Sequence, residues 1–156
     1  MATSFTRLNE GWNAEPNGHD PKIVVEGSDL LFEFLLNDLM FPKYKTAEAG
    51  ILRFPGCWRY RLGEPNDEGW YRGQCRFSRL APKWGELYEV HGDLLLDASP
   101  NPGAFRGRGI QLEPFSLGWV ALGEPVPSSR HFLFYLRDQT FECDASAWEF
   151  TVRWKA

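Results

Sequence analysis

The sequence contains no long hydrophobic segment. Its apolar runs fall far short of the ~20 residues that span a membrane as a helix, and the N-terminus lacks a charged stretch followed by an apolar core. Cysteine is scarce: Cys57, Cys75 and Cys143 form no Cys-x-x-Cys pair, and each falls within an apparent strand. Buried, reduced thiols are typical of cytoplasmic proteins, so we expect a soluble, cytoplasmic protein with no membrane partner.

Short motifs of common catalytic and metal sites are also missing. The sequence has no GxSxG, no P-loop and no GxGxxG at a strand-to-helix turn, and it has neither HxH nor HExxH spacing. His19, His91 and His131 lie far apart, so a metal site would have to assemble from distant positions. We therefore predict no catalytic residues, no metal and no cofactor. A motif-poor enzyme assembled from scattered residues stays open as an alternative.

A basic excess is absent. The chain carries 17 Lys and Arg against 21 Asp and Glu, a net charge of −4. Residues 1–50 hold four basic and eight acidic groups, so the acidic excess lies in the first third of the chain. Proteins that bind a polyanion need a positive field, and we therefore exclude nucleic acid as the main partner.

Aromatic residues are abundant, with seven Trp, five Tyr and twelve Phe among 156 residues. Aromatic side chains favour strands and pack well on pleated surfaces, which indicates an all-β protein. The length fits one domain better than two. We predict a single all-β domain over 1–156, built as an antiparallel β-sandwich or a closed barrel of about eight or nine strands.

Alternating apolar residues place the first strands. Residues 23–36 form a predicted hairpin that turns at Gly27-Ser28, and a helix over 29–40 is the competing interpretation. A strand over 51–62 is interrupted at Pro55-Gly56, because proline cannot donate to a strand ladder. Such a dipeptide marks a bulge, a corner or a split into two strands.

The second half of the chain repeats this pattern. A long strand over 84–96 has Tyr88 and Val90 on its predicted core face. A hairpin follows over 131–143 with its turn at Asp138-Gln139, and residues 148–154 add the last strand.

The central strand of the predicted sheet is the alternating stretch 67–77, whose outward face is rich in arginine. The predicted binding face consists of Arg59, Arg61, Trp70, Arg72 and Arg76. We expect it to be exposed to solvent and paired with Glu89 or Asp93 of the next strand. It is either a ladder of cross-strand ion pairs, a surface for a protein partner, or a site for an anionic small ligand.

Two segments have little regular structure in this prediction. Residues 1–21 form an irregular N-terminal segment in which Trp12 is expected to plug one end of the core. The Gly- and Pro-rich loop over 98–116 carries Phe105, which is followed by Arg106 and Arg108 and has glycines on both sides. Phe105, Arg106 and Arg108 are predicted to form a mobile tip for protein recognition, with a structural lid as the alternative.

We predict a non-catalytic binding protein whose partner is another protein, for example an inhibitory or immunity-type partner of a basic toxin. The alternative is a β-barrel with an aromatic interior that holds a small apolar ligand. Size and strand count are similar to those of lipocalin-like barrels. The Gly-x-Trp motif of that family is missing, because Gly11 and Trp12 are adjacent, and no family is assigned.

Overall fold

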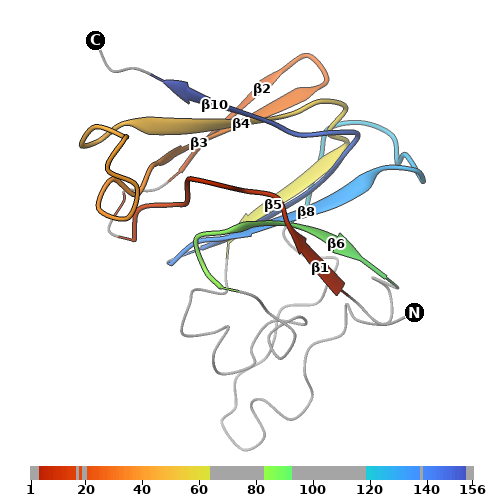
Figure 1. Cartoon of the computed structure of the whole chain (residues 1–156). Helices are drawn as coiled ribbons and strands as arrows, with labels where there is room; N and C mark the ends of the chain where they lie inside the picture. Colours follow the sequence, from red (N-terminus) through yellow and green to blue (C-terminus); the bar gives the residue numbers. More distant parts are fainter. Residues whose placement is uncertain are drawn as a thin grey trace, which may run out of the picture.

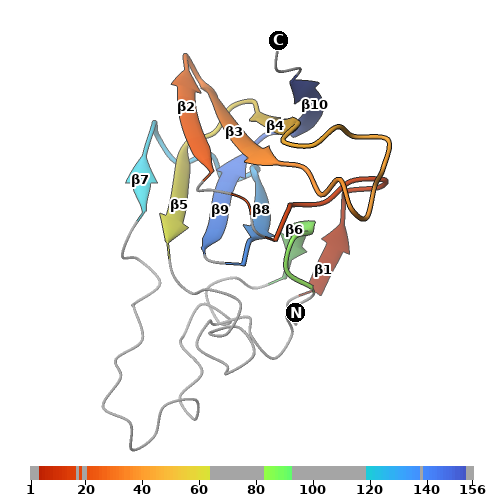
Figure 2. The same cartoon turned by 90° about the vertical axis from the view of Figure 1, so that its left-hand side faces the viewer.

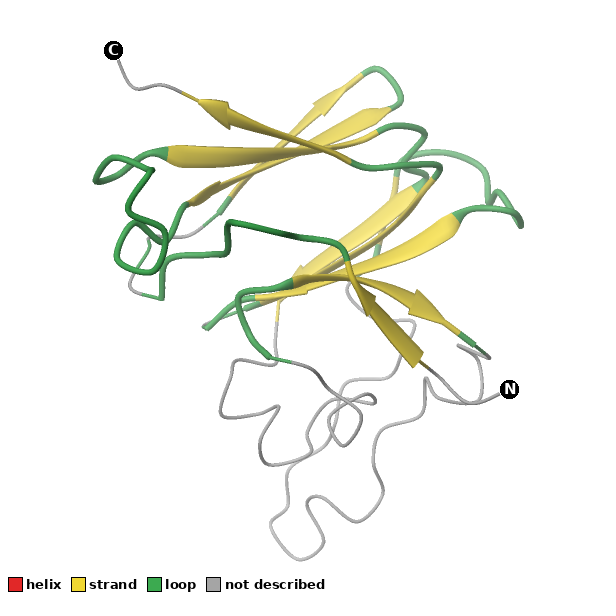
Figure 3. Cartoon of the chain, viewed as in Figure 1, coloured by secondary structure: helices red, strands yellow, loops and turns green. Residues whose placement is uncertain are grey.

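The computed structural model describes residues 4–16, 18, 21–63, 83–92, 119–137 and 139–153 (Figure 1). All regular elements in these residues are β-strands, which confirms the all-β class (Figure 3). The described part of the chain thus holds no helix that could cross a membrane. The strands are β1 (Ser4–Arg7), β2 (Lys22–Glu26), β3 (Asp29–Leu35), β4 (Ala49–Phe54), β5 (Arg59–Gly63), β6 (Leu87–His91), β7 (Val120–Ala121), β8 (Arg130–Tyr135), β9 (Thr140–Ala145) and β10 (Glu149–Arg153).

Hydrogen bonding joins these strands into two antiparallel sheets. A six-stranded sheet has the order β1-β6-β8-β9-β5-β7, and a four-stranded sheet has the order β10-β4-β3-β2. Figure 1 shows the four-stranded sheet lying across the six-stranded one. In Figure 2, β2 and β7 lie along one side of the molecule, and β10 and β1 lie along the other. No strand pairing in the described residues joins the two sheets, so the predicted alternative of a closed barrel is wrong.

Phenylalanine rings fill the space between the sheets. The ring centroid of Phe32 in β3 lies 4.4 Å from that of Phe141 in β9 and 5.7 Å from that of Phe134 in β8. Phe54 in β4 faces Phe132 in β8 at 5.3 Å. These rings are fully buried, and aromatic side chains of this size dominate the apolar area that a core removes from water.

Gly50 in β4 makes room for two further rings. A Cβ atom at this position would lie 2.7 Å from Phe34 Cζ and 2.9 Å from Phe150 Cε1, which is closer than carbon atoms approach. Phe150 also stacks on Trp12, with the ring centroids 4.2 Å apart. Trp12 is buried and closes this end of the core, as the sequence predicts.

The predicted hairpins are present. Strands β2 and β3 pair from Glu26–Asp29 to Lys22–Glu33, so Gly27 and Ser28 form the turn and the helix over 29–40 is wrong. The apolar residues of β3 that share one face are buried, which confirms the alternation. Strands β8 and β9 form the hairpin of the C-terminal half, and β10 follows it.

Pro55-Gly56 splits the predicted 51–62 strand into two strands. Strand β4 belongs to the four-stranded sheet and β5 to the six-stranded sheet, so the dipeptide is the corner where the chain passes between sheets. Gly56 adopts a φ of 63°, a backbone conformation that favours glycine.

The N-terminal segment is more regular than predicted. Strand β1 lies within the stretch expected to be irregular, and it pairs with β6. Its only apolar residue is Phe5, so the sequence offers no alternating pattern there. The chain then runs along β6, where the Asn9 side chain accepts a hydrogen bond from the Leu87 N–H (3.0 Å) and donates to the Glu86 carboxylate.

The face assignment of the predicted 84–96 strand is wrong. Strand β6 starts at Leu87, and Leu87 faces the phenylalanine core. Tyr88 and Val90 point to the other side, where they are nevertheless buried. The prediction failed because apolar residues are buried on both sides of this strand, so the alternation of Tyr88 and Val90 does not identify the side that faces the core.

Several predicted features lie outside the described residues. These are the central strand over 67–77 with Trp70, Arg72, Cys75 and Arg76, the loop over 98–116 with Phe105, Arg106 and Arg108, and Asp93.

Candidate functional site

The two arginines of β5 lie on the side of the six-stranded sheet that points away from the phenylalanine core, as the alternation predicts. Their neighbours are on β9, where Arg59 lies opposite Asp144 and Arg61 lies opposite Glu142. Arg59 Nε is 2.5 Å from Asp144 Oδ2, and Arg61 Nη2 is 3.5 Å from Glu142 Oε1. Arg61 is only 7% exposed, so the expectation of a solvent-exposed face is wrong for this residue.

For Arg59 and Arg61 the predicted pairing with Glu89 is also wrong, whereas the predicted pairing of Arg72 and Arg76 lies outside the described residues. Glu89 lies in β6, which is separated from β5 by β8 and β9. Its carboxylate binds Arg130, with Nη2 at 2.6 Å from Oε1 and Nε at 3.0 Å from Oε2. This pair holds the pKa of Glu89 below its usual range, chiefly through the hydrogen bond from the guanidinium.

His131 connects the two carboxylates of β9. Its Nδ1 is 2.9 Å from Asp144 Oδ1, and its Nε2 is 2.8 Å from Glu142 Oε2. His131 is 3% exposed and Glu142 1% exposed, so these contacts are made away from water. We call Arg59, Arg61, His131, Glu142 and Asp144 the charged network.

Trp119 lies against the arginines of the charged network. Its ring centroid is 4.1 Å from the guanidinium carbon of Arg59 and 5.6 Å from that of Arg61. The His131 ring meets Trp119 edge-on at 6.2 Å. The Trp58 ring centroid is also close to Arg59, at 4.6 Å from its guanidinium carbon. Planar guanidinium groups stack favourably on aromatic faces, so the two tryptophans help to fix Arg59 in position.

Burial and ion pairing shift the pKa values of His131 and Asp144 in opposite directions. Burial alone would lower the pKa of His131, but hydrogen bonds to Asp144 and Glu142 and their negative charges raise it above its ordinary value. Burial alone would raise the pKa of Asp144, but His131 and Arg59 lower it. Both directions favour a charged imidazolium between two carboxylates.

The polar groups of the charged network bind one another. Both ring nitrogens of His131 are engaged by carboxylates, so the imidazolium has no lone pair with which to take a proton from a substrate. Each carboxylate also binds an arginine. This geometry links the three adjacent strands β8, β9 and β5 and leaves His131 no free ring nitrogen to act as a base.

The described residues contain no cluster of three or more His, Cys, Asp or Glu side chains arranged to hold a metal ion. Cys57 and Cys143 are free and buried, which confirms the prediction for Cys143. The Cys57 thiol donates a hydrogen bond to the Arg59 carbonyl (3.3 Å), and the neighbouring Cys143 thiol lowers the pKa of Cys57 while burial raises that of Cys143. A sulfur without access to solvent is a poor nucleophile, so the pair acts as apolar filling.

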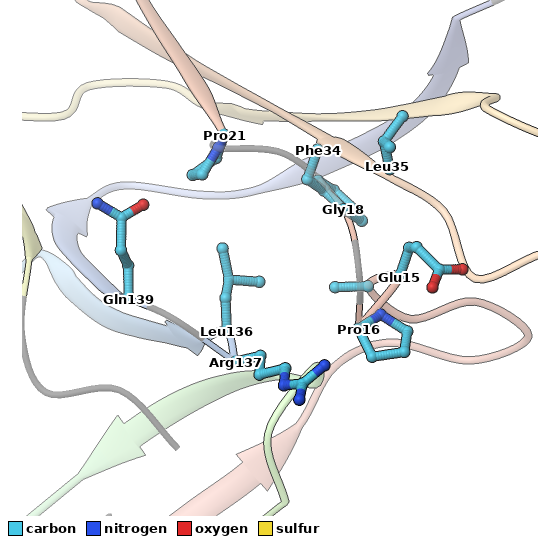
Figure 4. A pocket seen from close by; sticks show the side chains of 10 residues that line it. Glu15, Pro16, Gly18, Pro21, Phe34, Leu35, Leu136, Arg137 and Gln139 are labelled. Atoms are coloured by element: carbon cyan, nitrogen blue, oxygen red, sulfur yellow. The ribbon is translucent and has the colours of Figure 1, made fainter. Parts of the chain in front are cut away.

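A surface pocket lies between the N-terminal segment and the β8–β9 turn (Figure 4). Pro16 and Phe34 line one side, and Leu136, Arg137 and Gln139 line the other. Its cavity volume is about 30 Å³, which has room for one or two water molecules and is too small for a drug-sized ligand.

The connection between β3 and β4 displays the most exposed apolar side chains that the structure describes. Leu39 is 85% exposed and Met40 is 62% exposed. We call these two residues the loop tip. A buried position would remove their side chains from water at a gain of about 1.5–3 kcal/mol each, so their exposure needs an explanation.

The backbone around the loop tip is fixed by hydrogen bonds. The Asn37 side chain accepts from the Met40 N–H (3.2 Å), and the Asn37 carbonyl accepts from the Phe41 N–H (3.1 Å). Further along the loop, Glu48 accepts from the Lys45 N–H (2.8 Å). The exposed side chains are therefore carried by an ordered loop.

The sequence contained a signal for the charged network that the prediction did not use. Phe132 and Phe134 point into the core, so His131 has to point outward; Phe141 and Cys143 place Glu142 and Asp144 outward in the same way. Because these residues belong to one predicted hairpin, the three titratable side chains share one face. No signal of this kind identifies the loop tip, since the connection over residues 36–48 has no alternating pattern that assigns its side chains to a face.

No protein-family model matches the chain, and neither a curated protein nor a solved structure gives a match. The proposed function therefore depends on the geometry of this chain alone.

Proposed function

We propose that this protein acts by binding another protein and that the loop tip is an anchor of that interaction. The exposure of Leu39 and Met40 on a hydrogen-bonded loop is the observation that carries the proposal. Large apolar side chains that are held in place before binding lose little conformational entropy on contact, and they become the buried centre of an interface.

The charge of the surrounding chain favours a basic partner. The loop tip belongs to residues 1–50, where acidic groups outnumber basic groups by eight to four. An inhibitory or immunity-type role toward a basic protein fits this excess, because opposite charge speeds association and selects the partner. The proposed binding surface also keeps six positions that the sequence predicted: Trp70, Arg72, Arg76, Phe105, Arg106 and Arg108.

We propose in addition that the chain is a single-domain β-sandwich and that the protein is cytoplasmic. Two facing antiparallel sheets with aromatic rings between them support a single-domain β-sandwich, and two free, buried thiols support a reducing, cytoplasmic environment.

The two alternative functions have less support. A small apolar ligand in the interior would need space between the sheets, where Phe32, Phe134 and Phe141 are in ring contact. A motif-poor enzyme would need an available acid or base, whereas His131 has both ring nitrogens engaged.

The test is photo-crosslinking in cells that express the protein naturally. A photoreactive side chain at position 39 should capture one partner in stoichiometric amount, whereas the same group at position 126 should not. Val126 is a suitable control because it is also an exposed apolar residue, 44% exposed, in a different loop.

The captured partner is then purified and its affinity is measured. The double variant Leu39→Ser, Met40→Ser should bind at least about tenfold more weakly than the parent protein, since interface anchors contribute more than about 1 kcal/mol each. Val126→Ser should bind like the parent. Equal affinity of the three proteins, or equal capture at both positions, would refute the role of the loop tip.

A further inference from the structure

Among the described residues, β2 pairs with β3 alone, which makes it an edge strand of the four-stranded sheet. It contains no proline, and its two valines are exposed, with Val24 at 37% and Val25 at 45%. Natural proteins usually protect such an edge with proline, a bulge or a covering segment, because unpaired N–H and C=O groups readily accept another strand. Lys22 and Glu26 at the two ends of β2 are its charged residues.

The hydrogen bonds of β3 show which groups of β2 are unpaired. The Leu36 N–H donates to the Glu48 carbonyl beyond β4, and the Leu35 carbonyl accepts from the Glu15 N–H on the opposite side. Odd-numbered residues of β3 therefore direct their backbone groups toward β2, and even-numbered residues direct theirs toward β4.

The register transfers this alternation to β2. Val24 lies opposite Leu31 and exchanges backbone hydrogen bonds with it, and the same holds for Lys22 and Glu26 opposite their odd-numbered partners. Ile23 and Val25 lie between these pairs. Their N–H and C=O groups point away from β3, toward the open edge.

The sequence of β2, Lys-Ile-Val-Val-Glu, is complementary to itself in the antiparallel direction. We propose that two copies of this chain pair through β2 about a twofold axis at Val24. In this register Lys22 lies opposite Glu26 of the second copy at both ends, and Ile23 lies opposite Val25. The backbone groups of Ile23 and Val25 that face the open edge then meet each other, as an antiparallel hydrogen-bonded pair requires.

The side chains of β2 are available for this pairing. The described residues give Lys22 no ion-pair partner, although Glu33 lies opposite it, because the Glu33 carboxylate binds Arg153 at 2.9 Å. The Glu26 carboxylate contacts Arg53 at 3.3 Å and stays 56% exposed, so it can also accept Lys22 of the second copy. Opposite charges across strands stabilise a pairing and select its register.

The other edge of this sheet, β10, is a weaker candidate. Its sequence is also charged at both ends, but its cation Arg153 already binds Glu33. Its apolar residues Phe150 and Val152 are half-buried against the core, whereas the valines of β2 are exposed. The pairing through β2 uses a different surface from the loop tip and does not depend on the proposed function.

Analytical ultracentrifugation of the purified full chain tests the proposal. A single strand pairing makes a small interface, so the protein is studied from about 10 µM to about 1 mM. The parent protein should show a monomer–dimer equilibrium in this range. A monomer at every concentration would refute the proposal.

Two single charge reversals test the register. Lys22→Glu and Glu26→Lys each place like charges opposite one another at both ends, and each should weaken the dimer at least about tenfold. An equimolar mixture of the two variants restores opposite charges and should form a heterodimer. Weakening without recovery in the mixture, or no weakening, would place any dimer on another surface. Thermal unfolding of each variant checks that the monomer is intact.

Val25→Pro tests the backbone pairing separately. The Val25 N–H points to the open edge, so proline there should leave the β2–β3 hairpin folded and abolish the dimer. Amide hydrogen exchange of the parent protein gives a second measurement that needs no variant. Protection of the Ile23 and Val25 amides should rise with protein concentration, while that of Val24 should not change. Equal behaviour of the three amides would contradict the pairing.

Discussion

The two sheets differ most on their outer faces, which both carry alternating charged and apolar side chains. On the four-stranded sheet, Arg153 and Glu33 form an ion pair whose side chains are 57% and 24% exposed. On the six-stranded sheet, the side chains of His131 and Glu142 in the charged network are 3% and 1% exposed. The same kind of contact is therefore a solvated surface pair on one sheet and a buried interaction on the other.

This difference decides what each contact contributes. A surface ion pair gains little, because water already stabilises both charges and salt screens their attraction. In the charged network the charges have lost their water, so removal of one partner leaves another charge buried and uncompensated. We expect the outer face of the six-stranded sheet to control stability and that of the four-stranded sheet to be available for association.

The largest expected effect is the loss of one carboxylate from the charged network. Glu142→Ala removes the carboxylate that both His131 and Arg61 contact, and it should lower the free energy of unfolding by about 3–5 kcal/mol. The matched change Glu33→Ala on the other sheet should cost at most about 1 kcal/mol. Urea unfolding of both variants measures the difference, and equal costs would contradict the comparison.

A second matched pair tests the apolar residues of the two outer faces. Leu133 in β8 is fully buried on the outer face of its sheet, whereas Leu31 in β3 is half-buried on the other. Leu133→Ala should cost about 2–5 kcal/mol, because it opens a cavity as well as losing apolar burial. Leu31→Ala should cost clearly less, since solvent and neighbouring side chains can fill the space. The midpoints of chemical unfolding give both values.

The stability of the protein should also depend on the protonation of His131. Because its pKa is raised in the folded state, its contribution is complete below the unfolded value of about 6.5 and is lost as the pH rises through the folded value. His131→Gln should remove this decline. A pH series of unfolding free energies for both proteins measures it, and parallel curves would show that the imidazolium does not contribute.

The unfolding free energy should also fall at acidic pH, because of Asp144. The pKa of Asp144 is lowered in the folded state, so its contribution is present above its ordinary value of 3.8 and is lost as the pH falls through the folded value. Asp144→Asn should be less sensitive to acid than the parent protein in this range, although it is less stable near neutral pH.

The smallest expected effect is the response of the ion pairs to salt. A double-mutant cycle on Arg153 and Glu33 should give a coupling energy of about 0.2–1 kcal/mol that falls toward zero in about 1 M salt. The cycle on Arg61 and Glu142 should keep its coupling energy, because buried charges are screened much less. Equal salt dependence would mean that water reaches both pairs.

Much of the fold was predictable because its determinants are local. The turn at Gly27-Ser28 depends on two adjacent residues, and the break at Pro55-Gly56 depends on a proline that cannot donate a hydrogen bond. The alternation of Phe32 and Phe34 assigns the core face of β3. Strand β1 was not predictable in this way, because its pairing with β6 is between distant segments and its sequence is mostly polar.

The candidate sites were less predictable for the same reason. Alternation places Arg61 on the outward side of its strand, but it does not say which strand lies alongside. The order of the strands along the chain suggested a partner on the strand with Glu89, whereas the order of the strands in the sheet places Glu142 next to Arg61. The exposure of Leu39 is likewise a property of the folded loop and not of its composition.

The sequence alone determined the all-β class, the side of each strand on which most residues lie, and the acidic character of the first third of the chain. These follow from side-chain periodicity and from composition, which need no knowledge of distant contacts. The tertiary structure alone decided which strands are neighbours, that His131 joins two carboxylates, that one outer face is buried and that β2 is an edge strand among the described residues. Burial and pairing are sums over residues far apart in the chain, so a local pattern can assign a face but cannot say whether water reaches it.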